Sequence, residues 1–507
     1  MRASGELFPL CMRILLFMRK RALILLCLLA ATPGWGKVIL RWQQSSIPPA
    51  ATMGIKEVVV SWDAEALIRN ARRQGYSVYA EVQVGKAADM TRGAKRSNLA
   101  GIVLNPGNSQ PGQIEDDLRQ LRVSYPALPV LVLSAKGKQP QMKGQLVVKN
   151  NGVLYVTSPT AQPWIDSNLA LVRLDQVFRP AQTSLYEFQW DLADSVQQEY
   201  GPSTADYSLA VAEAGAFHAD LILNLHPRLQ TDLSRNAPAA WASFKEVKRY
   251  LAFSSQGSKN TGDPEANVGV ITDTYQKAYE PINLLGRHNI PFAVLRASEL
   301  KPRSLDAFNL VVVFAVPDEP VIAAITNFAS KGGIVVLVGA PGSYPWQSGQ
   351  AIPAGEHSVA YAAGKGRVIE LPGPIIDPET FAQDIRRLMA TDKDKNKDNV
   401  DINLWNALTV IAVPYSVAGG REKLVELVNY AQEPIPVQVR VKGSFSSVVY
   451  ETPDRACCES LTPVQRGEFT EFVIPSLRIA GRVRLTNREP RADRPANRAS
   501  DAHRSNI

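Results

Sequence analysis

Two glutamates, Glu81 and Glu187, are the residues of this sequence best suited to acid–base or nucleophilic chemistry. Glu81 lies in the run SVYAEVQV (77–84), and Glu187 lies in TSLYEFQW (183–190). Side chains alternate between the two faces of a strand, so each glutamate faces away from the apolar side of its run. Two carboxyl groups aimed into one site can divide the roles of proton donor and of base or nucleophile.

Other side chains suited to binding lie on or next to predicted strands. Alternation with leucines places Asn224 and His226 on the same face of the run 220–226. An aromatic ring such as Trp62 can stack on a ligand, although core packing is the commoner role of a single tryptophan. An alternative stays open, namely that these polar groups only hydrogen-bond one another at one end of a barrel. The candidate binding residues are Trp62, Asp63, Asn105, Asn224 and His226.

The elements that must position these residues are short β-rich runs that alternate with helical patterns over residues 37–260. This alternation predicts a compact TIM-like (β/α)₈ barrel, in which the carboxyl ends of the strands meet at one mouth. Glu81 and Glu187 are therefore expected at that mouth. The eight predicted strands are 38–42, 57–62, 77–84, 101–105, 130–134, 152–157, 183–190 and 220–226.

Two further units follow the predicted barrel. Residues 256–264 read as a linker, after which 265–390 alternates buried strands with helices, as in a flavodoxin-like α/β domain. Beyond a charged loop, 400–485 shows the alternating strands and turns of a small all-β sandwich. The last segment, 486–507, is rich in Arg, Asn, Pro and Ala, and is predicted to be a disordered tail.

The order of these units resembles the beta-galactosidase-type glycoside hydrolases. The stretches "VGVITDTYQKAYEPINLLGRHNIPFAVLRASEL" and "FNLVVVFAVPDEPVIAAITNFASKGGIVVLVG" are similar to their class I amidotransferase-like trimerisation domain. The ending "KLVELVNYAQEPIPVQVRVKGSF" resembles their closing β-domain. The turn after 334–338 reads Gly-Ala-Pro-Gly and has no thiol nucleophile, which excludes glutamine hydrolysis by the amidotransferase route. The resemblance implies that this unit serves packing or the formation of a homo-oligomer.

The resemblance also implies roles for the candidate residues. By this strand count Glu187 ends the seventh strand, where the family places its nucleophile. The fourth strand of the family supplies an Asn-Glu pair with Glu as acid/base, whereas this sequence has Asn105-Pro106, so Glu81 would have to replace that acid. Such a mechanism uses no cofactor and acts on a carbohydrate. Three hypotheses stay open: a hydrolase, an inactive carbohydrate-binding barrel favoured by the missing Glu, and an assembly protein of the cell envelope.

Residues 1–36 have the features of a secretory signal peptide. Arg19, Lys20 and Arg21 precede an apolar run over 22–31, which is too short to span a bilayer comfortably. We therefore expect an exported protein, periplasmic or extracellular, without stable membrane insertion after cleavage. Most of the net charge of +8 lies in 1–36 and in the tail, so the body lacks the basic stripe of a nucleic-acid-binding protein.

The cysteines and histidines do not predict a metal site. Only Cys457 and Cys458 remain outside the signal segment, and such a pair forms neither a disulfide framework nor a zinc motif. Whether they are joined or stay as two thiols is open. The histidines are scattered along the chain, and no HExxH motif is present.

Overall fold

The computed structural model describes residues 36–92, 98–134, 136–143, 148–150, 153–155, 164–192, 195–256, 261–301, 303–355, 358–390, 400–417 and 422–487. The predicted signal peptide, apart from Gly36, lies outside the described residues. So do residues 488–507 of the predicted tail and 391–399 of the charged loop. Within the described part, no helix is both long and apolar enough to cross a membrane.

Seven parallel strands of the described chain form a barrel sheet in the order β10-β11-β1-β2-β3-β4-β5. A parallel bridge between Ser134 and Tyr186 joins its two ends, and the Ser134 N–H donates a 2.8 Å hydrogen bond to the Leu185 carbonyl. The TIM-like barrel predicted from the sequence is thereby confirmed as a fold class. The strands are β1 (Val38–Arg41), β2 (Glu57–Ser61), β3 (Ser77–Gln83), β4 (Gly101–Asn105), β5 (Val130–Val132), β10 (Leu185–Tyr186) and β11 (Asp220–Asn224).

The predicted count of eight strands is wrong, because the described part of the candidate strand at 152–157 does not enter the barrel. Its described part, β8 (Val153–Tyr155), pairs antiparallel with β7 (Val148–Asn150). A second small pair joins β6 (Gln141–Lys143) to β9 (Trp164–Asp166). Since the residues after β5 bond directly to β10, no strand fits between them. Glu187 therefore follows the sixth strand of the described barrel, not the seventh.

The barrel is filled by one apolar side chain from each strand or its extension. These residues form a separate buried cluster: Ile39, Val59, Tyr79, Val103, Leu133, Leu185 and Ile222. Their positions confirm the alternation read from the sequence for the runs around Tyr79, Leu185 and Ile222. Because side chains repeat every second residue, Arg41, Glu81, Asn105, Glu187 and Asn224 follow on the same face toward the carboxyl mouth.

Helices surround the barrel and bury the opposite face of its strands against a large apolar core. The first crossover is only the four-residue helix α2. The other crossovers contain a longer helix or two helices. The helices around the barrel are α2 (Ala50–Met53), α3 (Glu65–Arg73), α4 (Ala87–Arg92), α5 (Pro111–Ser124), α6 (Leu169–Phe178), α7 (Ser195–Tyr200), α8 (Thr204–Phe217), α9 (Pro227–Ser234) and α10 (Pro238–Ser255).

The second unit is a seven-stranded sheet in the order β14-β13-β15-β16-β19-β18-β17. The first five strands in this order pair parallel, whereas β18 pairs antiparallel with both β19 and β17, so the predicted flavodoxin-like arrangement is confirmed. Its strands are β13 (Val268–Ile271), β14 (Phe292–Leu295), β15 (Leu310–Val313), β16 (Ile334–Val338), β17 (Ala351–Gly355), β18 (Ser358–Ala363) and β19 (Gly366–Leu371). Its α-helices are α11 (Tyr275–Arg287), α12 (Glu319–Ser330) and α13 (Pro378–Ala390).

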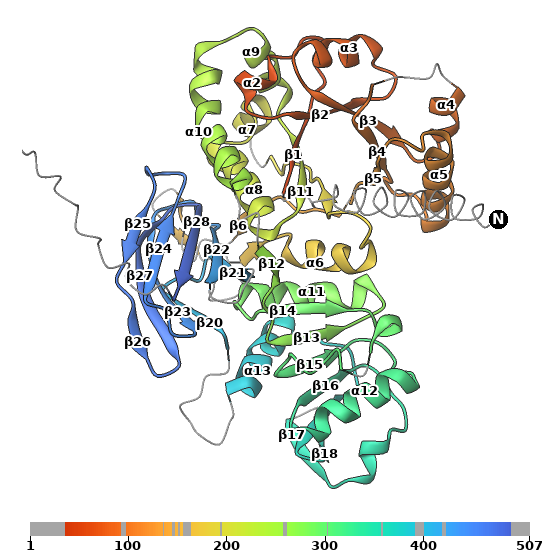
Figure 1. Cartoon of the computed structure of the whole chain (residues 1–507), viewed down its shortest axis with the longest axis vertical. Coiled ribbons are helices and arrows are strands. Elements are labelled where there is room, and N and C mark those ends of the chain that lie inside the picture. Colours follow the sequence, from red (N-terminus) through yellow and green to blue (C-terminus); the bar gives the residue numbers. More distant parts are fainter. Residues whose placement is uncertain are drawn as a thin grey trace, which may run out of the picture.

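The C-terminal unit is a β-sandwich, as predicted, with sheets ordered β12-β21-β22-β28-β24-β25 and β20-β23-β27-β26. One strand, β12 (Thr261–Pro264), comes from the segment predicted as a linker and pairs antiparallel with β21. Figure 1 shows the blue sandwich beside the barrel and the green-to-cyan α/β unit below the barrel. The remaining strands are β20 (Ile402–Trp405), β21 (Val410–Val417), β22 (Glu422–Asn429), β23 (Ile435–Lys442), β24 (Ser447–Glu451), β25 (Glu459–Leu461), β26 (Val464–Arg466), β27 (Phe469–Leu477) and β28 (Ala480–Thr486).

Candidate active site at the barrel mouth

A pocket of about 790 Å³ opens at the carboxyl ends of the barrel strands. Three of the residues singled out in the sequence line it: Asn105, Glu187 and Asn224. Amide side chains predominate, and Phe188 is the aromatic residue of the lining. The lining residues are Arg41, Gln83, Asn105, Gly107, Asn108, Gly137, Lys138, Gln139, Gln141, Lys143, Asp166, Glu187, Phe188, Gln189, Asp191 and Asn224.

Arg41, at the end of β1, connects the two candidate glutamates. Its Nη2 atom lies 2.6 Å from Oε1 of Glu81, and its Nη1 atom contacts Oε2 of Glu187. The three side chains are 13%, 14% and 18% exposed, so water screens these ion pairs only in part. A single guanidinium therefore fixes both carboxylates.

Arg41 was not among the residues predicted from the sequence, although a signal was present in the run VILRW. Leu40 and Trp42 are buried among the helices, whereas Ile39 fills the barrel interior. The same alternation that placed Glu81 puts Arg41 on the face of Ile39. A charged residue on an inward face near the strand end was the available cue.

Asn105 also binds Glu81. Its Nδ2 group donates a 2.7 Å hydrogen bond to Oε1 of Glu81, and its Oδ1 atom accepts one of 3.1 Å from the Gly107 N–H. Oε1 of Glu81 is thus held by a guanidinium and an amide at once. Before Glu81 could serve as a proton donor, its ion pair with Arg41 would have to break.

The surroundings of Glu187 differ from those of Glu81. Burial raises the pKa of the Glu187 carboxyl, and the nearby charge of Glu81 raises it further. The charge and the hydrogen bond of Arg41 act in the opposite direction. The raised pKa shows that burial outweighs the ion pair, an environment that is found at functional carboxylates and at structural ones.

The wall of the pocket beside Glu187 is a tightly apposed loop after β5. A Cβ added at Gly137 would lie 2.2 Å from the Glu187 carbonyl oxygen, so only glycine fits there. The Gln139 Oε1 atom accepts a 2.6 Å hydrogen bond from the Asp191 N–H. Asn168 binds the main chain of Lys138 on both sides, donating to its carbonyl and accepting from its N–H, each at 2.8 Å.

Three predicted binding residues do not line this pocket. Trp62 is half-buried and packs against the large core outside the barrel. Asp63 is exposed and accepts a hydrogen bond from the Ser61 hydroxyl. His226 caps helix α9, where its Nδ1 atom accepts from the Arg228 N–H at 3.4 Å. The structure thus brings Glu81, Asn105, Glu187 and Asn224 together and leaves these three apart.

Comparisons with known proteins bear on the fold. No family model matches the sequence, and no curated protein matches it. Solved structures do. The alpha-L-fucosidase isoenzyme 2 of Paenibacillus thiaminolyticus superposes with a TM-score of 0.55 at 12% identity, over 90% of this chain and all of that one. The GH42 beta-galactosidase Gan42B of G. stearothermophilus gives 0.52 at 10% identity, over 90% of this chain and 99% of that one.

A third neighbour is the beta-galactosidase of Rahnella sp. R3, with a TM-score of 0.53 at 10% identity, over 84% of this chain and 95% of that one. At such identities the likeness concerns the fold and leaves the chemistry of the site to be argued from its own residues. The chain has the fold of the beta-galactosidase-type glycoside hydrolases, with a parallel barrel followed by an α/β unit and a β-sandwich.

Proposed function

We propose that this protein recognises a carbohydrate at the carboxyl mouth of its barrel without cleaving it. The observation that carries the proposal is the contact of Arg41 with both Glu81 and Glu187. This guanidinium occupies both carboxylates of the mouth that the sequence offers for catalysis. They then serve to build a charged, ordered pocket floor.

The pocket suits a polyhydroxylated ligand. Its volume of about 790 Å³ lies within the range of small-molecule sites, which extends to roughly 1,000 Å³. Amides both donate and accept hydrogen bonds, as sugar hydroxyls do, and Gln83, Gln141, Gln189 and Asn224 are among those in the lining. The fold likeness to glycoside hydrolases points to the same class of ligand.

Cleavage lacks a proton donor in the position that the fold resemblance implies. The residue after Asn105 is Pro106, which has no ionisable side chain, and Asn105 itself is bound to Glu81. Without an acid, the leaving oxygen of a glycoside would depart unprotonated. This is the physical ground for recognition rather than hydrolysis.

Hydrolysis is the second candidate, and one observation favours it. Glu187 lines the pocket and its pKa is raised, while Glu81 lies on the other side of the same guanidinium. If Arg41 withdrew when a ligand bound, Glu187 would act as nucleophile and Glu81 as acid/base.

The experiment that separates the two compares hydrolysis of a panel of nitrophenyl glycosides with calorimetric binding of the corresponding oligosaccharides. The variants are Glu187→Gln and the control Glu199→Gln, an exposed residue paired with Arg228 outside the pocket lining. Recognition predicts binding without turnover, weakened by Glu187→Gln alone. Turnover that Glu187→Gln abolishes would establish the hydrolase. If the protein neither binds nor hydrolyses any sugar of the panel, both candidate functions are wrong.

We further propose that the chain is exported to the periplasm or the exterior. The support is the charged start and short apolar run within residues 1–36. N-terminal sequencing of the mature protein after cell fractionation tests it. Cleavage near Gly36 is the expected result, and an intact start in the cytoplasmic fraction would refute export.

A further inference from the structure

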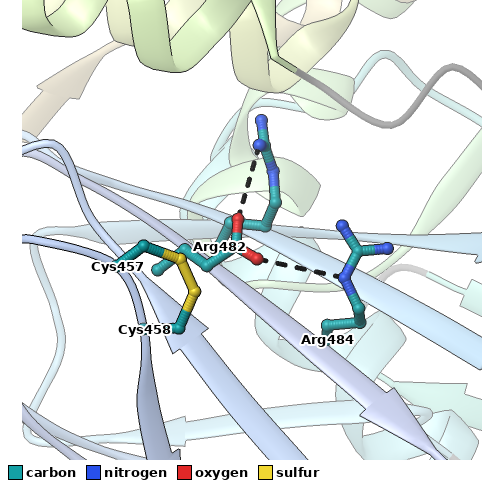
Figure 2. Close-up of a disulfide and its surroundings, with 5 residues drawn as sticks. Cys457, Cys458, Arg482 and Arg484 are labelled. Carbon is teal, nitrogen blue, oxygen red and sulfur yellow. Dashed lines mark ion pairs between the residues drawn. A yellow bond between two sulfur atoms is a disulfide. The ribbon is translucent and has the colours of Figure 1, made fainter.

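A pair of adjacent cysteines lies in the C-terminal sandwich, outside the lining of the barrel mouth. Cys457 and Cys458 are exposed, stand in the turn between β24 and β25, and are joined as a disulfide (Figure 2). The sequence left open whether they were joined or idle thiols. The function proposed for the barrel mouth does not use them.

Glu451, the last residue of β24, completes a group of three metal-ligating side chains. The two Sγ atoms and a carboxylate oxygen of Glu451 all lie within 4.8 Å of one another. In the described part of the chain, this is the group of His, Cys, Asp or Glu residues compact enough to hold one ion. Two sulfurs and one oxygen form a donor set suited to a thiophilic cation.

Among the three glutamates beside Arg482 and Arg484, Glu451 makes the longest ion pairs. Arg482 lies 2.6 Å from Glu426, and Arg484 lies 2.5 Å from Glu422. The contacts of Glu451 with these two arginines are long, at 3.8 and 4.0 Å, and are the dashed lines in Figure 2. Glu451 therefore shares both guanidinium groups with carboxylates that lie closer to them.

The strands hold Glu451 in place for such a role. Glu451 pairs with Arg482 across the ladder between β24 and β28, and Tyr450 pairs with Glu459 on β25. The carboxylate therefore stands on a regular sheet, while the cysteines lie on the turn that follows it. Ion binding would require ordering of the turn and not of the sheet.

We propose that the reduced form of this cysteine pair, together with Glu451, binds one thiophilic divalent cation of the zinc type. The ligands are Sγ of Cys457, Sγ of Cys458 and a carboxylate oxygen of Glu451, with water in the fourth position. The disulfide recorded in the structure is the closed form, because a sulfur bonded to sulfur is not a thiolate ligand.

Opening the site takes a thiol–disulfide exchange with a dithiol reductant. One thiolate of the reductant attacks a sulfur of the Cys457–Cys458 bond and releases the other cysteine as a thiolate. The second thiolate of the reductant then attacks the resulting mixed disulfide and releases the remaining cysteine. The reductant leaves oxidised to its own disulfide, and the protein gains two electrons and two protons as two thiols. Cation binding then releases those protons, so the affinity rises with pH.

The test uses the full chain with Cys11→Ser and Cys27→Ser, so that Cys457 and Cys458 are its remaining thiols among the four cysteines of the sequence. The protein is prepared oxidised, or reduced with dithiothreitol and desalted without air. Cd²⁺ binding is followed by sulfur-to-metal charge-transfer absorption, and Zn²⁺ affinity by competition with a chromophoric chelator. We expect one equivalent on the reduced protein and none on the oxidised protein.

Matched variants locate the ligands. Glu451→Gln should weaken Zn²⁺ binding by about tenfold or more, whereas Glu459→Gln, which removes a carboxylate paired with Arg455 on the next strand, should not. Equal binding by reduced and oxidised protein would overturn the proposal, as would equal affinities of the two glutamine variants. Thiols that react before reductant is added would overturn the redox gate. If a glutamine variant fails to fold, the reduced Cys11→Ser, Cys27→Ser chain is treated with iodoacetamide instead. Protection of Cys457 and Cys458 by Cd²⁺ would support the site, and equal alkylation with and without Cd²⁺ would overturn it.

Discussion

The Tyr430 hydroxyl donates a 2.5 Å hydrogen bond to Oε2 of Glu213, which joins the C-terminal sandwich to helix α8 of the barrel. Glu213 is fully buried and also accepts from Asn168 Nδ2 at 2.6 Å and from the Tyr186 hydroxyl at 3.3 Å. Asn168 in turn binds the main chain of Lys138 in the pocket wall. One buried carboxyl thus links the sandwich, strand β10 and the wall of the barrel mouth.

Glu213 makes the stability of the fold depend on pH. Burial raises the pKa of its carboxyl from 4.5 to about 7, against the opposing hydrogen bonds. The folded protein therefore binds more protons than the unfolded chain between these values, and the free energy of unfolding falls as pH rises from about 4.5 to about 7. Glu213→Gln should remove about 3 kcal/mol of this fall. Urea unfolding at a series of pH values measures it.

The matched control for that series is Glu199→Gln, because Glu199 is exposed on α7. Its pH profile should parallel that of the wild-type protein. If Glu213→Gln and the wild-type protein keep the same slope between pH 4.5 and 7, the buried carboxyl does not carry the proton and the interpretation is wrong.

Arg41 is expected to stabilise the fold through the two carboxylates that it separates. Arg41→Met leaves Glu81 and Glu187 facing each other without a cation, which we expect to lower the free energy of unfolding by about 2–3 kcal/mol, less than a fully buried pair. The loss should be larger at pH 8 than at pH 5, because burial raises the pKa of the Glu187 carboxyl and the lower pH favours its uncharged form. Chemical denaturation at the two pH values checks this.

A double-mutant cycle isolates the interaction of Arg41 with Glu187. In a Glu187→Gln background, Arg41→Met should cost at least ~1 kcal/mol less than in the wild-type protein. Arg387→Met, which removes an exposed pair with Asp384, should change stability by less than about 0.5 kcal/mol. Additive effects of the Arg41 and Glu187 substitutions would contradict the contact.

Replacing two glycines by alanine should change the free energy of unfolding in opposite directions. Gly137→Ala forces a Cβ against the Glu187 carbonyl, and we expect a loss of about 1–3 kcal/mol. Gly112, in helix α5, has no atom within 4 Å of an added Cβ, so Gly112→Ala should stabilise by about 0.5–1 kcal/mol. Thermal and urea unfolding compare the two. A neutral Gly137→Ala would show that the loop after β5 is not held against Glu187.

The sequence predicted those features that depend on local periodicity. Alternation of apolar and polar residues placed Glu81 and Glu187 on the inward face, because the side-chain period of a strand is two whatever its partners. The same reasoning predicted the flavodoxin-like sheet and the sandwich, both of which the structure confirms. Arg41 obeys the rule too, although it was not among the residues predicted from the sequence.

Tertiary structure alone decided which strands meet and which side chains pair. Periodicity could not show that Val153–Tyr155 lies outside the barrel, because this depends on the long-range hydrogen bond between Ser134 and Leu185. Nor could it show that Arg41 reaches glutamates 40 and 146 positions away, because long-range ion pairs depend on how the sheet closes. By itself, the sequence determined the faces of the elements and the order of the units. Closure of the barrel determined the chemistry of its mouth, because it brings side chains of β1, β3 and β4 and of the residue after β10 within hydrogen-bonding distance.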